Sequence, residues 1–135
     1  MKNLVITSAH LDENNYYRGN TDLTCYSGGI RLSDGLGDVY FSRLNIKGSI
    51  VVGRRCSICV DQDLVAGDFI HAEENITAGG NILAGLFIKA GARVRAGKDI
   101  RAVLDIRADW GVSAGGNLKA GSDITSRSMI EAGGN

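Results

Sequence analysis

A six-residue repeat of apolar positions runs through most of the chain. From Ile46 onward every sixth residue is isoleucine, valine or leucine, which makes fifteen consecutive hexads. From Leu64 onward the third hexad position is alanine in eleven of twelve cases, and the fourth is glycine in eight. A fixed period of this kind identifies a repeat architecture. The consensus is Ile-x-Ala-Gly-x-Asn/Asp.

This hexad predicts a short strand followed by a corner. Successive strand residues point to opposite faces, so the isoleucine and the alanine would face a core and the residue between them would face outward. Glycine then permits a sharp bend, including a positive φ, and Asn or Asp tolerates turn geometry. Repeated strands and corners build a β-helix whose narrow interior is filled by alternating large and small side chains.

Residues 18 apart should stack if three hexads make one coil. Asp or Asn recurs at this spacing without a break, at Asp63, Asn81, Asp99, Asn117 and Asn135. The sequence therefore predicts an all-β fold, a single-stranded triangular β-helix (solenoid) of about five 18-residue coils over residues 46–135. The hand of the helix stays open.

Residues 1–45 do not hold the hexad register and are predicted to form an N-terminal β cap. Short apolar runs predict strands at residues 4–6, 23–26, 30–32 and 39–41, with a turn at residues 34–38. A cap is expected because the open end of a solenoid leaves strand edges unpaired.

The C-terminal end has no comparable device, since residues 130–135 form a perfect repeat. An open end invites pairing with another open end, which predicts a twofold homodimer through the C-terminal coils. The residues expected to carry this self-association are Ile124, Met129, Ile130 and Asn135. A frayed last coil is the alternative.

Charge and composition exclude several classes of function. The chain has 15 Lys and Arg against 15 Asp and Glu among 135 residues, so its net charge is zero, which makes a nucleic-acid partner unlikely. No run of 18 apolar residues predicts a membrane helix, and the N-terminal apolar run is too short for a signal peptide. Three cysteines do not make a disulfide scaffold. We therefore expect a cytoplasmic protein of one solenoid and its cap.

One face of the predicted solenoid breaks the consensus with apolar side chains. Six of them take outward or corner positions and should stack together: Val65, Phe69, Leu83, Leu86, Phe87 and Leu104. An exposed apolar cluster of this size usually marks an interface, which predicts a protein partner. The alternative is that residues 1–45 fold over it.

Trp110 is the single tryptophan and falls at a different corner, where its stacking neighbours would be Ala92 and Ser128. An exposed tryptophan is a natural hot spot for partner binding. A structural lid over small neighbours is the alternative.

A basic stretch in the middle of the solenoid could contact phosphates. It comprises Lys89, Arg93, Arg95, Lys98, Arg101 and Arg107. Outward positions at this spacing fall on all three faces, and acidic residues are interleaved, so a solvated surface is the better interpretation.

No catalytic or metal site is expected. Cys56 and Cys59 form a C-x-x-C motif, but a closed zinc site needs four ligands, and the other candidates, Cys25, His10 and His71, are distant in sequence. The fifteen hexads contain no insertion that could wall a substrate pocket. We therefore expect a non-enzymatic protein without a cofactor.

The hexads of residues 75–85 (Asn-Ile-Thr-Ala-Gly-Gly-Asn-Ile-Leu-Ala-Gly) resemble those of small β-helix proteins of phages and prophages. That resemblance implies the cytoplasm of a bacterial or phage-infected cell. It also implies an inhibitor of host defence, including an anti-CRISPR protein that blocks an effector complex by binding. A second resemblance is to bactofilins, which polymerise by end-to-end stacking.

Three functions follow from these observations. The first is a protein-binding inhibitor or adaptor that uses the apolar face and Trp110. The second is a self-assembling structural protein of the bactofilin type. The third and most remote is an enzyme similar to the hexapeptide acyltransferases.

Overall fold

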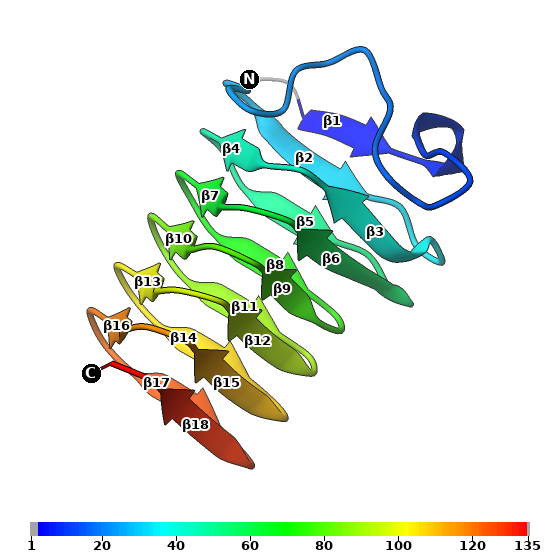
Figure 1. The fold of residues 1–135 in the computed structure, drawn as a ribbon. Coiled ribbons are helices and arrows are strands. Elements are labelled where there is room, and N and C mark those ends of the chain that lie inside the picture. Colours follow the sequence, from blue (N-terminus) through cyan, green and yellow to red (C-terminus); the bar gives the residue numbers. More distant parts are fainter. Residues whose placement is uncertain (1–2, 135) are drawn as a thin grey trace.

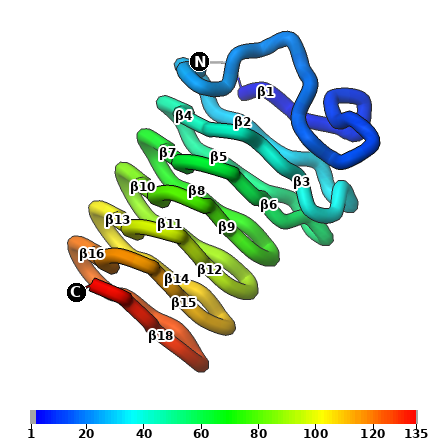
Figure 2. The backbone as a smooth tube through the Cα atoms, in the orientation of Figure 1, coloured from blue at the N-terminus to red at the C-terminus, as the bar shows by residue number. Residues whose placement is uncertain are grey.

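The computed structural model describes residues 3–134, which wind through about six turns of a β-solenoid (Figures 1 and 2). Each full coil contributes one strand to each of three parallel sheets, and this confirms the predicted triangular β-helix. The first and the last described strands lie at opposite ends of the stack.

The three sheets are described here by their number of strands. The seven-stranded sheet contains β1 (Asn3–Ile6), β2 (Gly29–Leu32), β5 (Ile50–Val52), β8 (Ile70–Ala72), β11 (Ile88–Ala90), β14 (Ile106–Ala108) and β17 (Ile124–Ser126). The five-stranded sheet contains β4 (Leu44–Ile46), β7 (Leu64–Ala66), β10 (Ile82–Ala84), β13 (Ile100–Ala102) and β16 (Leu118–Ala120). The six-stranded sheet contains β3 (Gly37–Phe41), β6 (Cys56–Val60), β9 (Ile76–Ala78), β12 (Arg93–Ala96), β15 (Gly111–Ala114) and β18 (Met129–Ala132).

The core follows the hexad pattern. In strands β7 to β14 the side chain at the first hexad position is fully buried, and the alanine at the third is at most 7% exposed. The residue between them faces outward, as at Leu83 between Ile82 and Ala84. Large and small side chains therefore alternate along the inner wall, as the repeat predicts.

The first coil departs from the predicted register. Ile46 and Val52, which the repeat places at the first hexad position, pair with alanines of the next coil and so occupy the third. Leu44 and Ile50 hold the first position, each 20 residues before its partner. In this coil both inward positions of a strand carry a large buried side chain. Two large side chains need more interior space than a large and a small one, and the two additional residues of the coil make its cross-section wider.

The 18-residue register begins at Ile58, which pairs with Ile76. Five residues separate Val52 from Ile58, two more than the three that separate their partners Ala72 and Ile76 in the next coil. Arg55 lies in that longer segment with a φ of 54°, a conformation that is uncommon for a residue other than glycine. The extra residues in this corner bring the sequence into the regular repeat.

The hexad glycines allow coils to stack closely, and they do not use the positive φ that glycine permits. Among the described residues, glycines with positive φ are found only at positions 35 and 37, before the first regular coil. A Cβ atom at Gly85 would instead collide with the carbonyl oxygen of Gly67 in the coil before it. Glycine is preferred here because it lets one backbone approach another.

The positions where another residue replaces the corner glycine show the effect of a Cβ atom. The N–H of Gly85 donates to the preceding coil at 3.0 Å, and that of Gly91 does so at 2.9 Å. The corresponding hydrogen bonds from Val103 and Asp109 are both 3.3 Å long. A side chain at this position therefore lengthens the bond between coils without breaking it.

We expect Gly85→Ala to lower the free energy of unfolding by about 1 kcal/mol, because the added methyl group overpacks a corner built for close approach. Val103→Ala is the matched control. It places the same residue at the stacked position of the next coil, where a side chain is already accommodated, and should change stability by less than about 0.5 kcal/mol. Urea denaturation measures both, and equal losses would contradict this account of the corner.

The N-terminal segment pairs with the first edge of all three sheets. β1 pairs with β2, the N–H of Tyr17 donates to the carbonyl of Tyr40 in β3 at 2.9 Å, and the N–H of Tyr26 donates to the carbonyl of Asn45 in β4 at 3.0 Å. The strand predicted at residues 23–26 is wrong, since only an isolated bridge at Tyr26 forms there. A 3₁₀ helix, η1 (Ser8–His10), follows β1.

Aromatic side chains hold this N-terminal segment on the solenoid. The rings of Tyr16 and Tyr40 stack with centroids 5.3 Å apart, and those of Tyr17 and Phe41 stack at 5.7 Å. The hydroxyl of Tyr16 donates to the carboxylate of Asp61 at 2.9 Å, which raises the pKa of that tyrosine. The segment therefore contributes both backbone pairing and aromatic packing at this end.

Candidate functional site

An apolar corner joins the five-stranded and seven-stranded sheets. We use this name for five residues: Phe69, Leu86, Phe87, Val103 and Leu104. The rings of Phe69 and Phe87 stack almost parallel, with centroids 4.8 Å apart and planes at 4°. The N–H of Leu104 donates to the carbonyl of Leu86 at 2.8 Å, so the backbone of this corner is fixed by hydrogen bonds between coils.

The structure stacks the six predicted apolar residues in pairs. Val65 and Leu83 are register neighbours on the outer face of the five-stranded sheet, and both are half-buried. Leu86 and Leu104 keep 38% and 42% of their surface exposed. The N-terminal segment therefore does not cover the corner at these two leucines.

Val103 belongs to this surface and was missed by the sequence analysis. Its side chain is 62% exposed, more than that of either leucine. The available signal was its place in the repeat, because it stands at a fourth hexad position where glycine is the rule.

Trp110 lies at another corner, between the seven-stranded and six-stranded sheets. Its N–H donates to the carbonyl of Ala92 at 2.8 Å, and the N–H of Met129 donates to its carbonyl at 3.4 Å. Trp110 is 62% exposed, so most of its surface is open to contact. Trp110 and the apolar corner are thus two separate surfaces on either side of one sheet.

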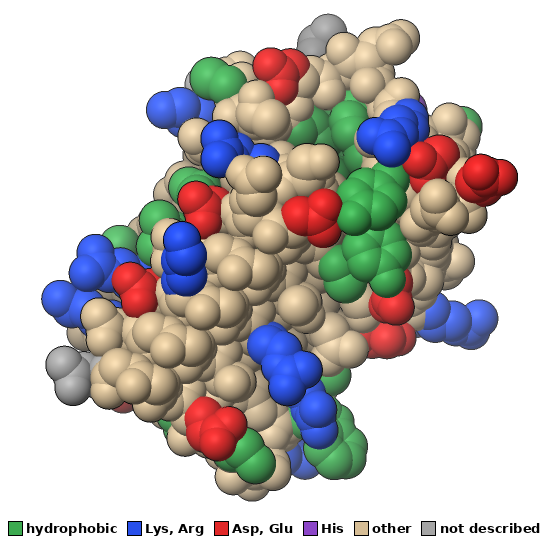
Figure 3. All heavy atoms as spheres, viewed as in Figure 1, with side chains coloured by type: hydrophobic (Ala, Val, Ile, Leu, Met, Phe, Trp, Pro, Cys, Tyr) green, Lys and Arg blue, Asp and Glu red, His purple; other side chains and the backbone are tan. Residues whose placement is uncertain are grey.

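The basic residues are spread over the three faces, as the sequence predicts. Lys89 and Arg107 are neighbours on the seven-stranded sheet, Arg101 lies on the five-stranded sheet, and Arg93 and Arg95 lie on the six-stranded sheet. Figure 3 shows side chains of both charge signs interspersed on the face that it displays. The basic residues therefore form no single positive stripe along the solenoid.

The Asp and Asn column is a hydrogen-bond ladder. A side-chain oxygen of Asp63 accepts from the N–H of Asn81 at 2.8 Å, and the same contact links Asn81 to Asp99 and Asp99 to Asn117. Asn135, the last member predicted, lies outside the described residues. The column satisfies backbone donors at a corner and thereby has a structural role.

The C-terminal coil has no neighbouring coil on its outer side among the described residues. β16, β17 and β18 are the last strands of their sheets, so one edge of each is unpaired there. Ile124 is half-buried, whereas Met129 and Ile130 are 53% and 49% exposed. The residues predicted for self-association, other than Asn135, therefore share one end of the solenoid.

Cys56 and Cys59 do not form a paired site. They lie three positions apart in β6, and residues at this spacing point to opposite faces of a strand. Cys56 is fully buried, and Cys59 is half-buried on the outer face. Burial raises the pKa of each thiol to about 11, with Asp38 and Asp61 adding to the shift at Cys59. Neither thiol has the lowered pKa of a reactive cysteine.

These thiols predict a loss of stability at high pH. A thiol whose pKa is about 9 in the unfolded chain and about 11 in the fold favours folding below pH 9, and this contribution is lost as the pH rises through 11. We expect the free energy of unfolding to fall between pH 9 and 11, and the slope to be smaller in a Cys56→Ala, Cys59→Ala variant. Denaturant titrations across this range measure the slope, and Cys25→Ala, at an exposed cysteine, should leave it unchanged. An unaltered slope in the double variant would refute the assignment.

Within residues 3–134, no cluster of three or more His, Cys, Asp or Glu side chains could hold a metal ion. His10 accepts a hydrogen bond from the N–H of Thr7 at the start of η1, and His71 lies 3.9 Å from Glu73. The same part of the chain contains no helix of the length and apolarity that crossing a membrane requires.

No protein family, curated protein or solved structure matches this chain.

Proposed function

We propose that this protein binds another protein through exposed apolar side chains of its solenoid and acts without chemistry, as an inhibitor or an adaptor. The observation that carries the proposal is the apolar corner, where Leu86, Val103 and Leu104 are 38%, 62% and 42% exposed. Large exposed apolar side chains that lie together usually mark an interaction site.

The backbone beneath the corner favours tight binding. Hydrogen bonds between coils fix it on both sides, as between Leu86 and Asp68 at 3.0 Å and between Leu104 and Leu86 at 2.8 Å. A surface that is already ordered loses little conformational entropy when a partner binds. Trp110 adds a second exposed anchor of the residue type most enriched at hot spots.

A test of the proposal uses affinity capture from a bacterial lysate with three variants. Leu104→Asp and Trp110→Ala should each lose a stoichiometric partner that the wild-type protein retains. Val5→Asp is the matched control, because Val5 is 48% exposed but lies on β1 at the far end of the solenoid. Circular dichroism and thermal melting check that the variants fold.

The identity of the captured protein would decide the narrower role. A bacterial defence complex would support the inhibitor of host defence that the sequence resemblance implies. Capture that neither Leu104→Asp nor Trp110→Ala reduces would contradict the proposal.

Self-assembly is the second candidate, supported by the unpaired edges of β16, β17 and β18 among the described residues. Because residues 3–26 pair with the N-terminal edges of β2, β3 and β4, we expect contacts through the other end, which close after two copies. This favours a twofold homodimer over a filament. Analytical ultracentrifugation over a range of concentrations tests it, and long filaments in electron micrographs would instead support a bactofilin-type polymer.

A further inference from the structure

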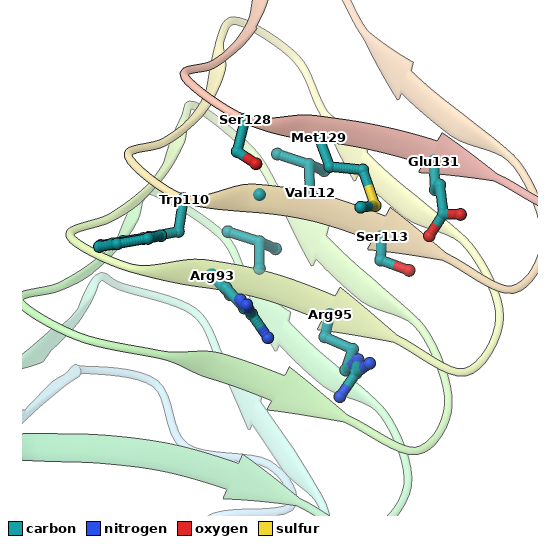
Figure 4. Close-up of a pocket in the computed structure, with 10 residues that line it drawn as sticks. Arg93, Arg95, Trp110, Val112, Ser113, Ser128, Met129 and Glu131 are labelled. Carbon is teal, nitrogen blue, oxygen red and sulfur yellow. The ribbon is translucent and has the colours of Figure 1, made fainter.

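A hollow lies on the outer face of the six-stranded sheet, near its C-terminal end (Figure 4). Gly111 occupies the outward position between Arg93 of β12 and Met129 of β18, and the three are in register. Glycine has no side chain, so one place in this row of outward side chains is empty. The resulting cavity has a volume of about 310 Å³.

Two apolar side chains border the hollow: Trp110 at the corner, and Met129 on the strand next to Gly111. Trp110 and Met129 are 62% and 53% exposed, although both border the cavity. Ligand pockets usually measure about 300–1,000 Å³. A volume at the low end of that range suits one large side chain better than a whole small molecule.

The charges around the hollow are arranged along the solenoid axis. Arg93 and Arg95 project from β12, and among the described residues neither forms an ion pair. Glu131 lies on β18 beyond Ser113, in register with Arg95. One edge of the hollow is therefore cationic and the opposite edge carries a carboxylate.

We propose that this hollow binds a segment of a partner protein in which a large apolar side chain stands next to a carboxylate. The apolar side chain would pack against Trp110 and Met129 over Gly111, and the carboxylate would pair with Arg93 or Arg95. Arginine binds carboxylates through two parallel hydrogen bonds. The inference rests on the proposed protein-binding function and names the chemistry of one contact.

A single strand of nucleic acid fits the site less well, although it also uses tryptophan and arginine. Its phosphates repeat along the strand, so several of them would lie near the site. A strand passing over Trp110 would place phosphates near the carboxylates of Asp109 and Glu131 as well as near the arginines. A peptide needs only one negative charge at the correct place. The charge pattern of the hollow matches this requirement.

The first test selects random heptapeptides displayed on phage against the folded full chain. Wild-type protein should enrich peptides with an aromatic or long aliphatic residue next to Asp or Glu. Arg93→Glu, Arg95→Glu protein should enrich Lys or Arg in place of the acid. The matched control is Arg101→Glu, Lys119→Glu, which reverses the same number of exposed charges on the five-stranded sheet and should select the wild-type motif.

The second test measures the affinity of the best wild-type peptide, made synthetically with a fluorescent label. Trp110→Ala and the Arg93→Glu, Arg95→Glu variant should each weaken binding by about tenfold or more, equivalent to 1.4 kcal/mol. The Arg101→Glu, Lys119→Glu control should stay within about twofold. Enrichment of no peptide, or of peptides without an acid, would overturn the inference.

Other outcomes separate this inference from the proposed function. Selected peptides that lose affinity in Leu104→Asp but not in Trp110→Ala would place binding at the apolar corner, so the inference would fail while the proposed function stood. Binding of a fluorescent oligothymidylate that Trp110→Ala abolishes would assign the hollow to nucleic acid. A dimer in ultracentrifugation that Trp110→Ala converts to monomer would assign it to a second copy of the chain.

Discussion

Replacing Ile88 with alanine is expected to lower the free energy of unfolding by about 2–5 kcal/mol, the usual range when a buried isoleucine loses this many carbon atoms. Ile88 is fully buried and pairs with Ile70 and Ile106 in the coils on either side. Hydrogen bonds between coils hold these two isoleucines in place, so the wall cannot close into the space that the missing carbon atoms leave. Because total stability of a domain is about 5–15 kcal/mol, this one change removes a large fraction of it.

Ile124 provides the matched control for Ile88. It has the same hexad position and the same sheet two coils later, but it is only half-buried because no described coil lies beyond it. We expect Ile124→Ala to cost less than half as much as Ile88→Ala. Denaturant unfolding followed by circular dichroism measures both. Equal losses would mean that the C-terminal coil is buried in solution, as a homodimer through that end would require.

The regular part of the fold could be predicted because one physical constraint repeats along it. Each inner position contacts the equivalent position 18 residues away, so the same small set of side chains is selected at every turn. The constraint also applies at the corners. The same side-chain to backbone hydrogen bond recurs every 18 residues, from Asp63 to Asn81 and from Asn81 to Asp99. A solenoid is quasi-one-dimensional, and its neighbours in space are known once its period is known.

The first coil could not be predicted in this way, because apolar residues alone do not define a register. Ile46 and Val52 fit the six-residue period, yet they occupy the third strand position. The true signal was alanine, which appears at that position only from Ala66 onward. Where both inner positions are large, a shift of two residues leaves the apolar pattern almost unchanged.

The candidate surfaces could be predicted only in part from the sequence, because the period alone does not show how single departures from it change the surface. The stacking of Phe69 on Phe87 follows from the 18-residue period. The exposed surface of Val103 and the hollow at Gly111 each depend on a single position of the repeat. Val103 adds a side chain where glycine is usual, and Gly111 lacks a side chain in a row of outward residues. Gly111 stands at a last hexad position, and the hollow arises because glycine lies there between Arg93 and Met129.

Removing residues 1–28 is expected to convert the protein into end-to-end assemblies. This deletion strips β1 from β2, the segment around Tyr17 from β3 and the segment around Tyr26 from β4, which exposes one edge of all three sheets. The last strands, β16 to β18, are unpaired on their other edge among the described residues. Parallel strands at both ends of a stack can continue one another, and a head-to-tail contact of this kind does not close.

Light scattering and electron micrographs measure this result, with filaments or a steep rise in mass expected for the truncated chain only. Tyr16→Phe is the matched control, because it removes the hydroxyl that donates to Asp61 but leaves the backbone pairing of the N-terminal segment in place. A truncated protein that keeps its β-sheet circular dichroism and stays the size of the wild type would contradict the argument. That outcome would mean that the edges of β2, β3 and β4 do not need a partner.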